Sequence, residues 1–448
     1  MRPRSSSRGR DPRECKRAKP RTSVDRSLIL NECRENYRRA EDYGADLPSL
    51  GNRWGVFKQE MSARIRNFGS LEEAIEFGQL RCNFDHRGKV GPTDIPEIQM
   101  ARRLLAYEYP IHAGLIDTFS DTSASAPGTY LTLPVAGGRS VLASRILYFH
   151  AFYILTVLSQ IENVRSICEI GGGYGNPAWL WMNCPAGPIH TYCIVDLPES
   201  LFFAEAFLRS ALPDVRVEYA HGEGPLEGEP AERTVRLVPV QHHARTGAMR
   251  FDVVVNTGSL AEMPDAWVAF WSDWLDRQNA RHFYSHNYFG NPVNKLFEGR
   301  ATFAPRVPNG WEATYIRAMH PLMLLQSRER RAAEIIFTKT AEPADRCAFG
   351  AFLRGMDGLK LSLESYIALS YRARQRNHRN LPDAVTFIRK VLRDFGYAPV
   401  ELLSLASGMI ADDEFKDLEV AERDYVLNLH AELRQKFESA YPRGTLAT

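Results

Sequence analysis

Cysteine is scarce and irregularly spaced in this sequence, which argues against the disulfide-rich and zinc-binding classes of protein. The 448 residues include seven cysteines, an odd number, and no two of them form a C-x-x-C pair. A disulfide framework or a structural zinc site would need regularly spaced thiols. We therefore expect no metal site and a reducing, cytoplasmic setting, with Cys168 and Cys193 as small core residues within apolar runs.

Long apolar runs are also missing. The best candidate, ILYFHAFYILTVL at 146–158, is shorter than a membrane span and contains a histidine, so it predicts a buried helix and no membrane insertion. The N-terminal segment lacks the apolar h-region of a signal peptide. Neither a G-x-x-x-x-G-K-[ST] phosphate loop nor a G-x-S-x-G nucleophile elbow occurs, so the signatures of P-loop enzymes and α/β-hydrolases are absent from the sequence.

Strong overall charge is absent too, because the formal net charge is +2 and the pI is near 8.1. By composition the chain is not a polyanion binder, and nucleic acid is not expected as a partner. Residues 2–26 are an exception, with ten Arg or Lys, three acids and almost no apolar residues. Such a segment cannot bury enough surface to fold alone, so we predict a disordered basic tail over 1–26. An arm for nucleic acid or a membrane surface is the alternative interpretation.

The rest of the chain divides into three predicted parts. A chain of 448 residues exceeds the usual size of one domain. Apolar positions at three- and four-residue spacing predict helices over 27–80, and together with the mixed, turn-containing stretch 83–140 they make a mainly helical region over 27–140. Strands alternate with helices in 141–345, the predicted central domain, and helical segments return in 346–448 as a C-terminal domain or extension. The sequence does not predict an oligomeric state.

The middle part predicts the fold class. Its strand candidates are VRSICEI, HTYCIVD, VRVEYA, TVRLVPV, FDVVVNT, ARHFYSHN and AEIIFTKT, and its helix candidates include NPAWLWMN, PESLFFAEAFLRSAL and PDAWVAFWSDWLDRQ. Strands this apolar, separated by helices, indicate a parallel sheet covered on both faces. We therefore predict an α/β fold with a Rossmann-like sheet. Which of the two strands between 215 and 240 is the third in that sheet stays open.

A glycine-rich turn, GGGYG, follows the first of these strands. Ligands of open α/β sheets bind beyond the carboxyl ends of the strands, where glycines let the backbone approach without a Cβ in the way. A helix that begins directly afterwards adds free N–H groups. The spacing Glu169-x-Gly171-x-Gly173-x-Gly175 fits the loop with which methyltransferases bind S-adenosylmethionine. We predict that these four residues and Tyr174 bind that cofactor.

The same loop fits a dinucleotide motif less well. Counted from Gly173, GYGNPA is formally G-x-G-x-x-A, but two surplus glycines then separate strand and motif. Asp196 ends the second strand, where an acid can bond to the ribose hydroxyls of either cofactor. It could also cap the helix that starts at Pro198. Glu169 could orient the loop, meet the methionine ammonium group, or pair with a basic neighbour.

Four blocks together resemble the sugar O-methyltransferase family. They are ICEIGGGYG, IVDLPESLFFAEAFL, FDVVVNTGSLAEM and HFYSHNYF, in this order and at these spacings. The resemblance covers about 140–340 and implies a class I S-adenosylmethionine-dependent methyltransferase. The glycine loop is general to methyltransferases, whereas N-T-x-S-L-x-E-M and Y-S-x-N are more particular. This chain departs from the pattern at Gly258, where a larger, often basic, side chain is expected.

Methyl transfer to a hydroxyl requires donor and acceptor to be held in line, and a general base helps because a hydroxyl is a poor nucleophile. In the block NTGSLAEM, Asn256 and Thr257 are predicted to bind the cofactor and Ser259 the acceptor. Glu262 is predicted to act as the base or to bind an acceptor hydroxyl. Its alternative role is that of a first-turn helix acid just before Pro264.

The block YSHN supplies the second candidate base, His286, because histidine titrates near neutrality. A satisfied polar residue is the alternative for this histidine. Tyr284 and Asn287 are predicted to bind acceptor hydroxyls. The sequence thus predicts methyl transfer from S-adenosylmethionine to a sugar or a glycosylated small molecule. The alternatives are an NAD-dependent sugar oxidoreductase and a non-catalytic nucleoside-binding module.

Overall fold

The structure, a computed structural model, describes a defined part of the chain. The described residues are 25–40, 47–49, 51–81, 98–99, 101–102, 105–106, 109, 112–116, 131–135, 139–185, 189–222, 224–226, 228–260, 263–288, 311–317, 332–339, 385, 389, 406–407, 409–410 and 413–440. Three sequence predictions lie outside them. These are the basic tail up to residue 24, the candidate base Glu262, and most of the predicted helical segments between 357 and 412.

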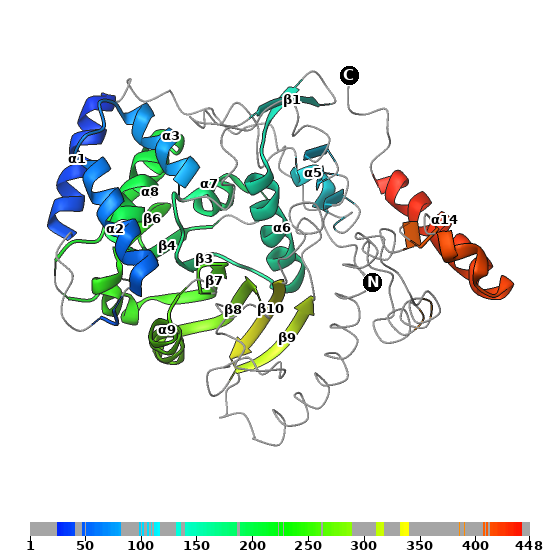
Figure 1. The fold of residues 1–448 in the computed structure, drawn as a ribbon. Coiled ribbons are helices and arrows are strands. Elements are labelled where there is room, and N and C mark those ends of the chain that lie inside the picture. Colours follow the sequence, from blue (N-terminus) through cyan, green and yellow to red (C-terminus); the bar gives the residue numbers. More distant parts are fainter. Residues whose placement is uncertain are drawn as a thin grey trace, which may run out of the picture.

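An eight-stranded sheet lies at the centre of this described part, in the order β5-β6-β4-β3-β7-β8-β10-β9 (Figure 1). The strands are β3 (Ser166–Ile170), β4 (Thr191–Asp196), β5 (Arg216–Tyr219), β6 (Thr234–Pro239), β7 (Arg250–Thr257), β8 (Asn279–Tyr288), β9 (Trp311–Arg317) and β10 (Ala332–Lys339). All neighbours from β5 to β8 are parallel, and β10 is antiparallel to both β8 and β9. The chain leaves β3 for one edge and later returns to β7 on the other side, so the topological switch point lies between these strands. The predicted α/β fold with a Rossmann-like sheet is confirmed.

The structure also answers the question of the third strand. β6 pairs with β4 over its whole length, and β5 lies outside β6 at the edge of the sheet. The burial follows this order, because β6 is buried throughout while three of the four residues of β5 are exposed or half-buried. Two features were not predicted. They are β9 at the opposite edge and a separate hairpin of β1 (Leu131–Val135) and β2 (Arg139–Ala143).

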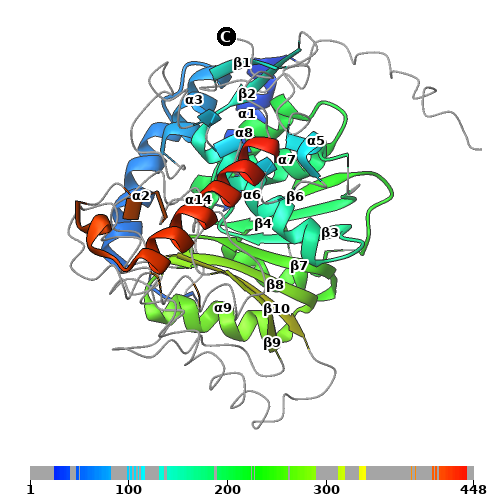
Figure 2. The same ribbon diagram turned by 90° about the vertical axis from the view of Figure 1, so that its right-hand side faces the viewer.

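Helices cover both faces of the sheet and build two hydrophobic cores (Figures 1 and 2). One core contains α6 (Arg145–Gln160), α7 (Asn176–Asn183) and α8 (Pro198–Ala211); the other contains α9 (Asp265–Arg277). Successive strand residues alternate between them, with Ile194 in the first core and Cys193 and Val195 in the second. Cys168 also lies in the second core, so both cysteines predicted to be core residues are buried.

The N-terminal helices α1 (Arg26–Ala40), α2 (Gly51–Ile65) and α3 (Leu71–Arg81) pack on α8. α1 and α3 share the first hydrophobic core with α8. The fit is close, since a Cβ added at Gly78 would lie 2.8 Å from Phe203. Polar groups join α1 to α8 as well: Asn36 donates to the buried Glu205 (2.7 Å), and Arg209 of α8 forms an ion pair with Glu32 of α1. The core is therefore continuous across residue 140, the predicted limit of the N-terminal region.

Towards the C-terminus, the structure describes a short helix, η5 (Asp413–Asp417), and α14 (Val420–Ala440), where the sequence predicts a helix. Two further short helices complete the described elements: α5 (Ala113–Ile116) and η3 (Val240–Ala248), which follows β6. Within the described residues, no helix is both long enough and apolar enough to cross a bilayer.

Candidate functional site

The turn after β3 requires glycine for conformational reasons. Gly171, Gly173 and Gly175 have φ of 75°, 56° and 88°, in the left-handed region that side-chain-bearing residues rarely adopt. The turn is closed by backbone hydrogen bonds from Gly171 N to Val195 O (2.9 Å) and from Gly175 N to Gly172 O (3.0 Å). Helix α7 begins immediately afterwards at Asn176, followed by a proline suited to a first helical turn.

The glycines also allow other parts of the protein to approach the turn. A Cβ at Gly171 would lie 2.7 Å from Ser259 Cβ, and one at Gly175 would lie 2.9 Å from Leu208. A Cβ at Gly172 would lie 2.8 Å from a Glu169 oxygen. At these three positions the missing side chains make room for the protein itself. The prediction that the glycines make room for a ligand is therefore incomplete at these three positions.

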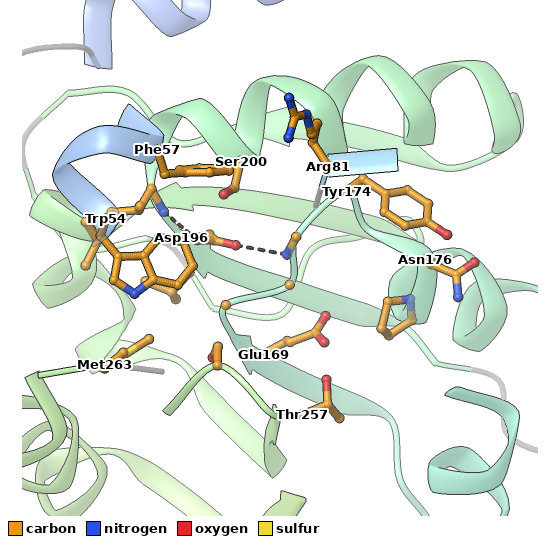
Figure 3. Close-up of a pocket in the computed structure, with 18 of the residues that line it drawn as sticks. Trp54, Phe57, Arg81, Glu169, Tyr174, Asn176, Asp196, Ser200, Thr257 and Met263 are labelled. Carbon is orange, nitrogen blue, oxygen red and sulfur yellow. Dashed lines mark hydrogen bonds between the residues drawn. The ribbon is translucent and has the colours of Figure 1, made fainter. Parts of the chain in front are cut away.

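Asp196 at the end of β4 holds this turn in place. Its Oδ2 accepts from Gly173 N (2.9 Å) and its Oδ1 from Leu197 N (2.7 Å), as the dashed lines of Figure 3 mark. The N-cap of α8 is Leu197, which has no side-chain capping bond, so the expected capping role of Asp196 is not observed. Burial raises the pKa of Asp196, and the two backbone N–H groups oppose that rise.

Glu169, near the end of β3, has a different environment from Asp196. Its Oε2 accepts from the Tyr192 hydroxyl (2.8 Å), while its Oε1 is buried without a hydrogen-bond partner among the described residues. Behind it, Tyr153 and Tyr192 are 3.4 Å apart at their hydroxyls, and Trp181 donates to Tyr153. Burial raises the pKa of Glu169 to about 8. This carboxyl group therefore lacks one partner that a ligand could supply.

A cavity of about 290 Å³ opens beside this turn. Its polar lining includes Glu169, Asp196, Ser200, Thr257 and Ser259, which come from the ends of β3, β4 and β7 and from the start of α8. Figure 3 shows Glu169 and Asp196 on either side of the glycine turn, with Thr257 nearby and Tyr174 and Asn176 at one end. The position is the one expected for a ligand site in an open α/β sheet, beyond the carboxyl ends of the strands next to the switch point.

An aromatic wall faces the other end of the cavity. It is formed by Trp54, Phe57 and Met61 of α2 together with Met263, Pro264, Trp267 and Trp271 at and after the start of α9. Figure 3 places Trp54, Phe57 and Met263 on the same side of the turn as Asp196. The segment before α2 is fastened to α9, because Trp267 Nε1 donates to Ser49 O (3.0 Å). At the rim, Arg81 forms an ion pair with Glu60 (2.8 Å).

The predicted residues of the block NTGSLAEM are close to the glycine turn. Asn256 is fully buried and donates to Ile170 O (2.8 Å), and Ser259 donates to the same carbonyl (3.0 Å). Thr257 and Ser259 line the cavity, whereas Asn256 is not among its lining residues. The geometry therefore gives Asn256 a supporting position behind the turn, and its predicted contact with the cofactor stays a prediction.

The predicted residues of the block YSHN lie deeper. Asn287 donates to Asn256 Oδ1 (3.0 Å), and the Tyr284 hydroxyl donates to Glu334 (2.6 Å). The His286 ring packs edge-on against Phe149, with centroids 4.9 Å apart, and burial lowers its pKa to about 3. None of these YSHN residues lines the cavity. Their roles as base and acceptor ligands stay predictions, and Tyr174 by contrast does line the cavity.

Several residues that line the cavity were not predicted from the sequence. They are Trp54, Phe57, Ile146, His150 and Asn176. A helical apolar pattern marks the faces that carry the first four, but this pattern is equally typical of a core-facing stripe. Among the described residues, no group of three or more His, Cys, Asp or Glu side chains could hold a metal ion.

Comparisons with known proteins add nothing to the geometry of the site. No family model matches the chain, and no curated protein matches it. Among solved structures it is similar to magnesium protoporphyrin IX methyltransferase (ChlM) from Synechocystis PCC 6803 with bound SAH (12% identity, TM-score 0.30, 60% of this chain and 100% of that one). It is also similar to M. capricolum TrmK in complex with S-adenosyl-homocysteine (11%, 0.28, 64% and 97%) and to EvdMO1 (17%, 0.25, 40% and 37%). Such TM-scores carry no argument, so the fold assignment rests on the strand order and the site on its own geometry.

Proposed function

We propose that the protein is an S-adenosylmethionine-dependent O-methyltransferase that methylates a hydroxyl of a sugar or a glycosylated small molecule. The observation that carries the proposal is the unpartnered, buried Oε1 of Glu169 at the edge of the glycine turn. A buried acceptor of this kind is costly unless a donor meets it. The ammonium group of the methionine moiety is such a donor, and its positive charge also favours the ionised carboxylate.

The charges around the turn favour this donor over a dinucleotide. A pyrophosphate would need free backbone N–H groups, but Gly171, Gly173 and Gly175 already donate to Val195 O, Asp196 and Gly172 O. Two carboxyl groups, Glu169 and Asp196, line the same cavity, and a pyrophosphate beside them would make both still harder to ionise. A sulfonium nucleoside with an ammonium group has the complementary charge.

The chain's contribution to the reaction is mainly positional. The bound donor supplies an already activated methyl group, so the protein has to hold donor and acceptor in line and exclude water. Glu169 and the turn would fix the donor's amino-acid end, and Asp196, at the end of β4, would lie beside its ribose. Removing the hydroxyl proton is assigned to Glu262 or His286 as a proposal that rests on the sequence.

The acceptor class rests on the sequence resemblance and is supported by the cavity wall. The aromatic wall extends from Trp54 and Phe57, on the side of the donor's nucleoside, to Trp267 and Trp271 of α9. Aromatic surface of this kind packs against the apolar face of a sugar ring. The Glu60–Arg81 pair at the rim offers charged hydrogen-bonding groups to hydroxyls. The partner of the protein is accordingly a saccharide or small-molecule acceptor.

A thermal-shift titration tests the donor assignment. S-adenosylhomocysteine should stabilise the wild type, by about 2.7 kcal/mol at 100 times its Kd, whereas NAD⁺ at the same concentration should not. Glu169→Ala should lose most of this shift. Stabilisation by NAD⁺ alone would favour the oxidoreductase alternative.

Methyl transfer itself is tested with labelled S-adenosylmethionine and a series of monosaccharides and glycosides, followed by mass spectrometry of the products. A labelled saccharide confirms the acceptor class. Donor binding without transfer to any acceptor in a cell extract would instead indicate a non-catalytic nucleoside-binding module.

A further inference from the structure

His150 lies in the wall of the cavity, and the proposed methyl transfer gives it no role. It belongs to α6, and Ile146, one turn earlier on the same face, also lines the cavity. The side chain is almost fully buried, with 5% of its surface exposed. Three residues further along α6, Tyr153 contacts the tyrosine that holds Glu169. This face of α6 is therefore directed at the amino-acid end of the proposed donor site.

The hydrogen bond to Asn176 fixes where the imidazole carries its proton. Asn176 Nδ2 lies 2.6 Å from His150 Nδ1. With the Asn176 amide in this orientation its nitrogen donates to Nδ1, and the ring proton then sits on Nε2. Burial lowers the pKa of His150 to about 3, so the ring stays neutral. The result is a neutral imidazole whose free nitrogen is a hydrogen-bond donor.

The cavity needs such a donor if its ligand has an amino-acid end. That end carries a carboxylate beside the ammonium group. Among the described residues that line the cavity, Arg81 has the one permanent positive charge, and it is paired with Glu60. The N–H groups of Gly171, Gly173 and Gly175 already have acceptors. A further N–H donor in the wall would therefore suit the carboxylate.

We propose that His150 and Glu169 form a subsite for an α-amino-acid group, in which Glu169 Oε1 accepts from the ammonium and His150 Nε2–H donates to the carboxylate. The inference rests on the proposed function and deepens it, since it makes His150 a specificity-determining residue for the donor. Asn176 is the positioning residue that selects the tautomer. The subsite would distinguish the complete donor from nucleosides that lack the amino-acid end.

Calorimetric titration with two ligands tests the subsite. S-adenosylhomocysteine has the amino-acid end, and 5′-methylthioadenosine shares its nucleoside but lacks that end. The wild type should prefer S-adenosylhomocysteine. His150→Phe should weaken it about ten- to hundredfold, the usual effect of losing a hydrogen bond to a charged group, and leave 5′-methylthioadenosine unchanged. His282→Gln is the matched control, because His282 bonds to Thr338 and lies outside the cavity wall.

A second measurement does not depend on a variant that folds. In protein labelled with ¹⁵N-histidine, His150 should give the signals of the Nε2–H tautomer, and S-adenosylhomocysteine should shift them more than 5′-methylthioadenosine does. A full S-adenosylhomocysteine preference in folded His150→Phe, or an Nδ1–H tautomer in the wild type, overturns the subsite while the proposed function stands. If the wild type binds neither ligand, the proposed function fails and the subsite with it.

Discussion

At the scale of single residues, the two acids of the cavity differ in how their oxygens are satisfied. Both oxygens of Asp196 accept backbone N–H groups, whereas Glu169 has one tyrosine partner and one unpartnered oxygen. Asp196 thus stabilises the conformation of the glycine turn. Glu169 keeps an acceptor free for a ligand, and without that ligand it is costly to ionise.

This cost makes the ligand-free protein sensitive to pH. The pKa of Glu169 is raised from 4.5 to about 8, so between these values the folded state binds more protons than the unfolded state. Folding stability should then fall as pH rises from about 5 to 8, by at most about 1.4 kcal/mol per pH unit for this group. Glu169→Gln should flatten this dependence, which urea denaturation at several pH values measures. An equal or steeper fall in the variant would contradict the assignment.

Single residues of the site were only partly predictable. Glu169 and the glycines were predictable from their motif, and Asp196 from its place at the end of the next strand. Both signals follow from the strand–turn–helix geometry. Sequence could not reveal that Ser259 occupies the space beside Gly171, since these residues are 88 positions apart. Nor could it place His150, whose role depends on a hydrogen bond to the start of another helix.

At the scale of elements, α2 acts as one wall of the cavity. Trp54, Phe57 and Met61 lie at helical spacing on one face and line the cavity, whereas Val56 on the same helix is 63% exposed. Figure 3 shows Trp54 and Phe57 on the side of Asp196, where the nucleoside of the donor is expected.

Trp54→Ala should therefore weaken S-adenosylhomocysteine at least tenfold, because it removes apolar surface buried against the ligand. Val56→Ala, on the solvent face of the same helix, is the control and should bind normally. Calorimetry of the two variants decides the point. Equal affinities would mean that α2 contributes nothing to donor binding.

Sequence patterns located most strands and helices of the sheet, because buried parallel strands are apolar over their whole length. They could not give the order of the strands. β5 was as convincing a strand as β6, and only pairing with β4 separates the two. β9 follows no helix in the predicted alternation and is held by pairing with β10, which a local pattern does not contain.

At the scale of the whole molecule, the helices before residue 82 and the Rossmann-like sheet share one core. Glu205 is fully buried at their junction and is bound by Asn36 of α1 and Arg209 of α8. The local patterns that separated 27–140 from 141–345 could not show this, because a shared core depends on contacts far apart in the chain. The limits of the domains stay predictions.

A shared core predicts cooperative unfolding. Urea transitions followed by far-ultraviolet circular dichroism and by tryptophan fluorescence should coincide for these regions. Glu205→Ala should shift both midpoints downwards together, by about 1–3 kcal/mol in stability, since it removes the buried acceptor of Asn36 and one of the two carboxylates paired with Arg209. Glu35→Ala, which removes the exposed ion pairs of Glu35 with Arg38 and Arg39 in α1, is the control and should change stability by less than about 1 kcal/mol. Two separate transitions would contradict the shared core.

The tryptophans of the cavity wall have a practical consequence. Trp54, Trp267 and Trp271 supply three of the protein's seven indoles to the surface that a ligand would touch. A purine stacked or wedged among them changes their emission when they are excited in the near ultraviolet. The protein thus carries its own optical reporter, and unlabelled compounds can be screened for occupancy by fluorescence quenching before any acceptor is known.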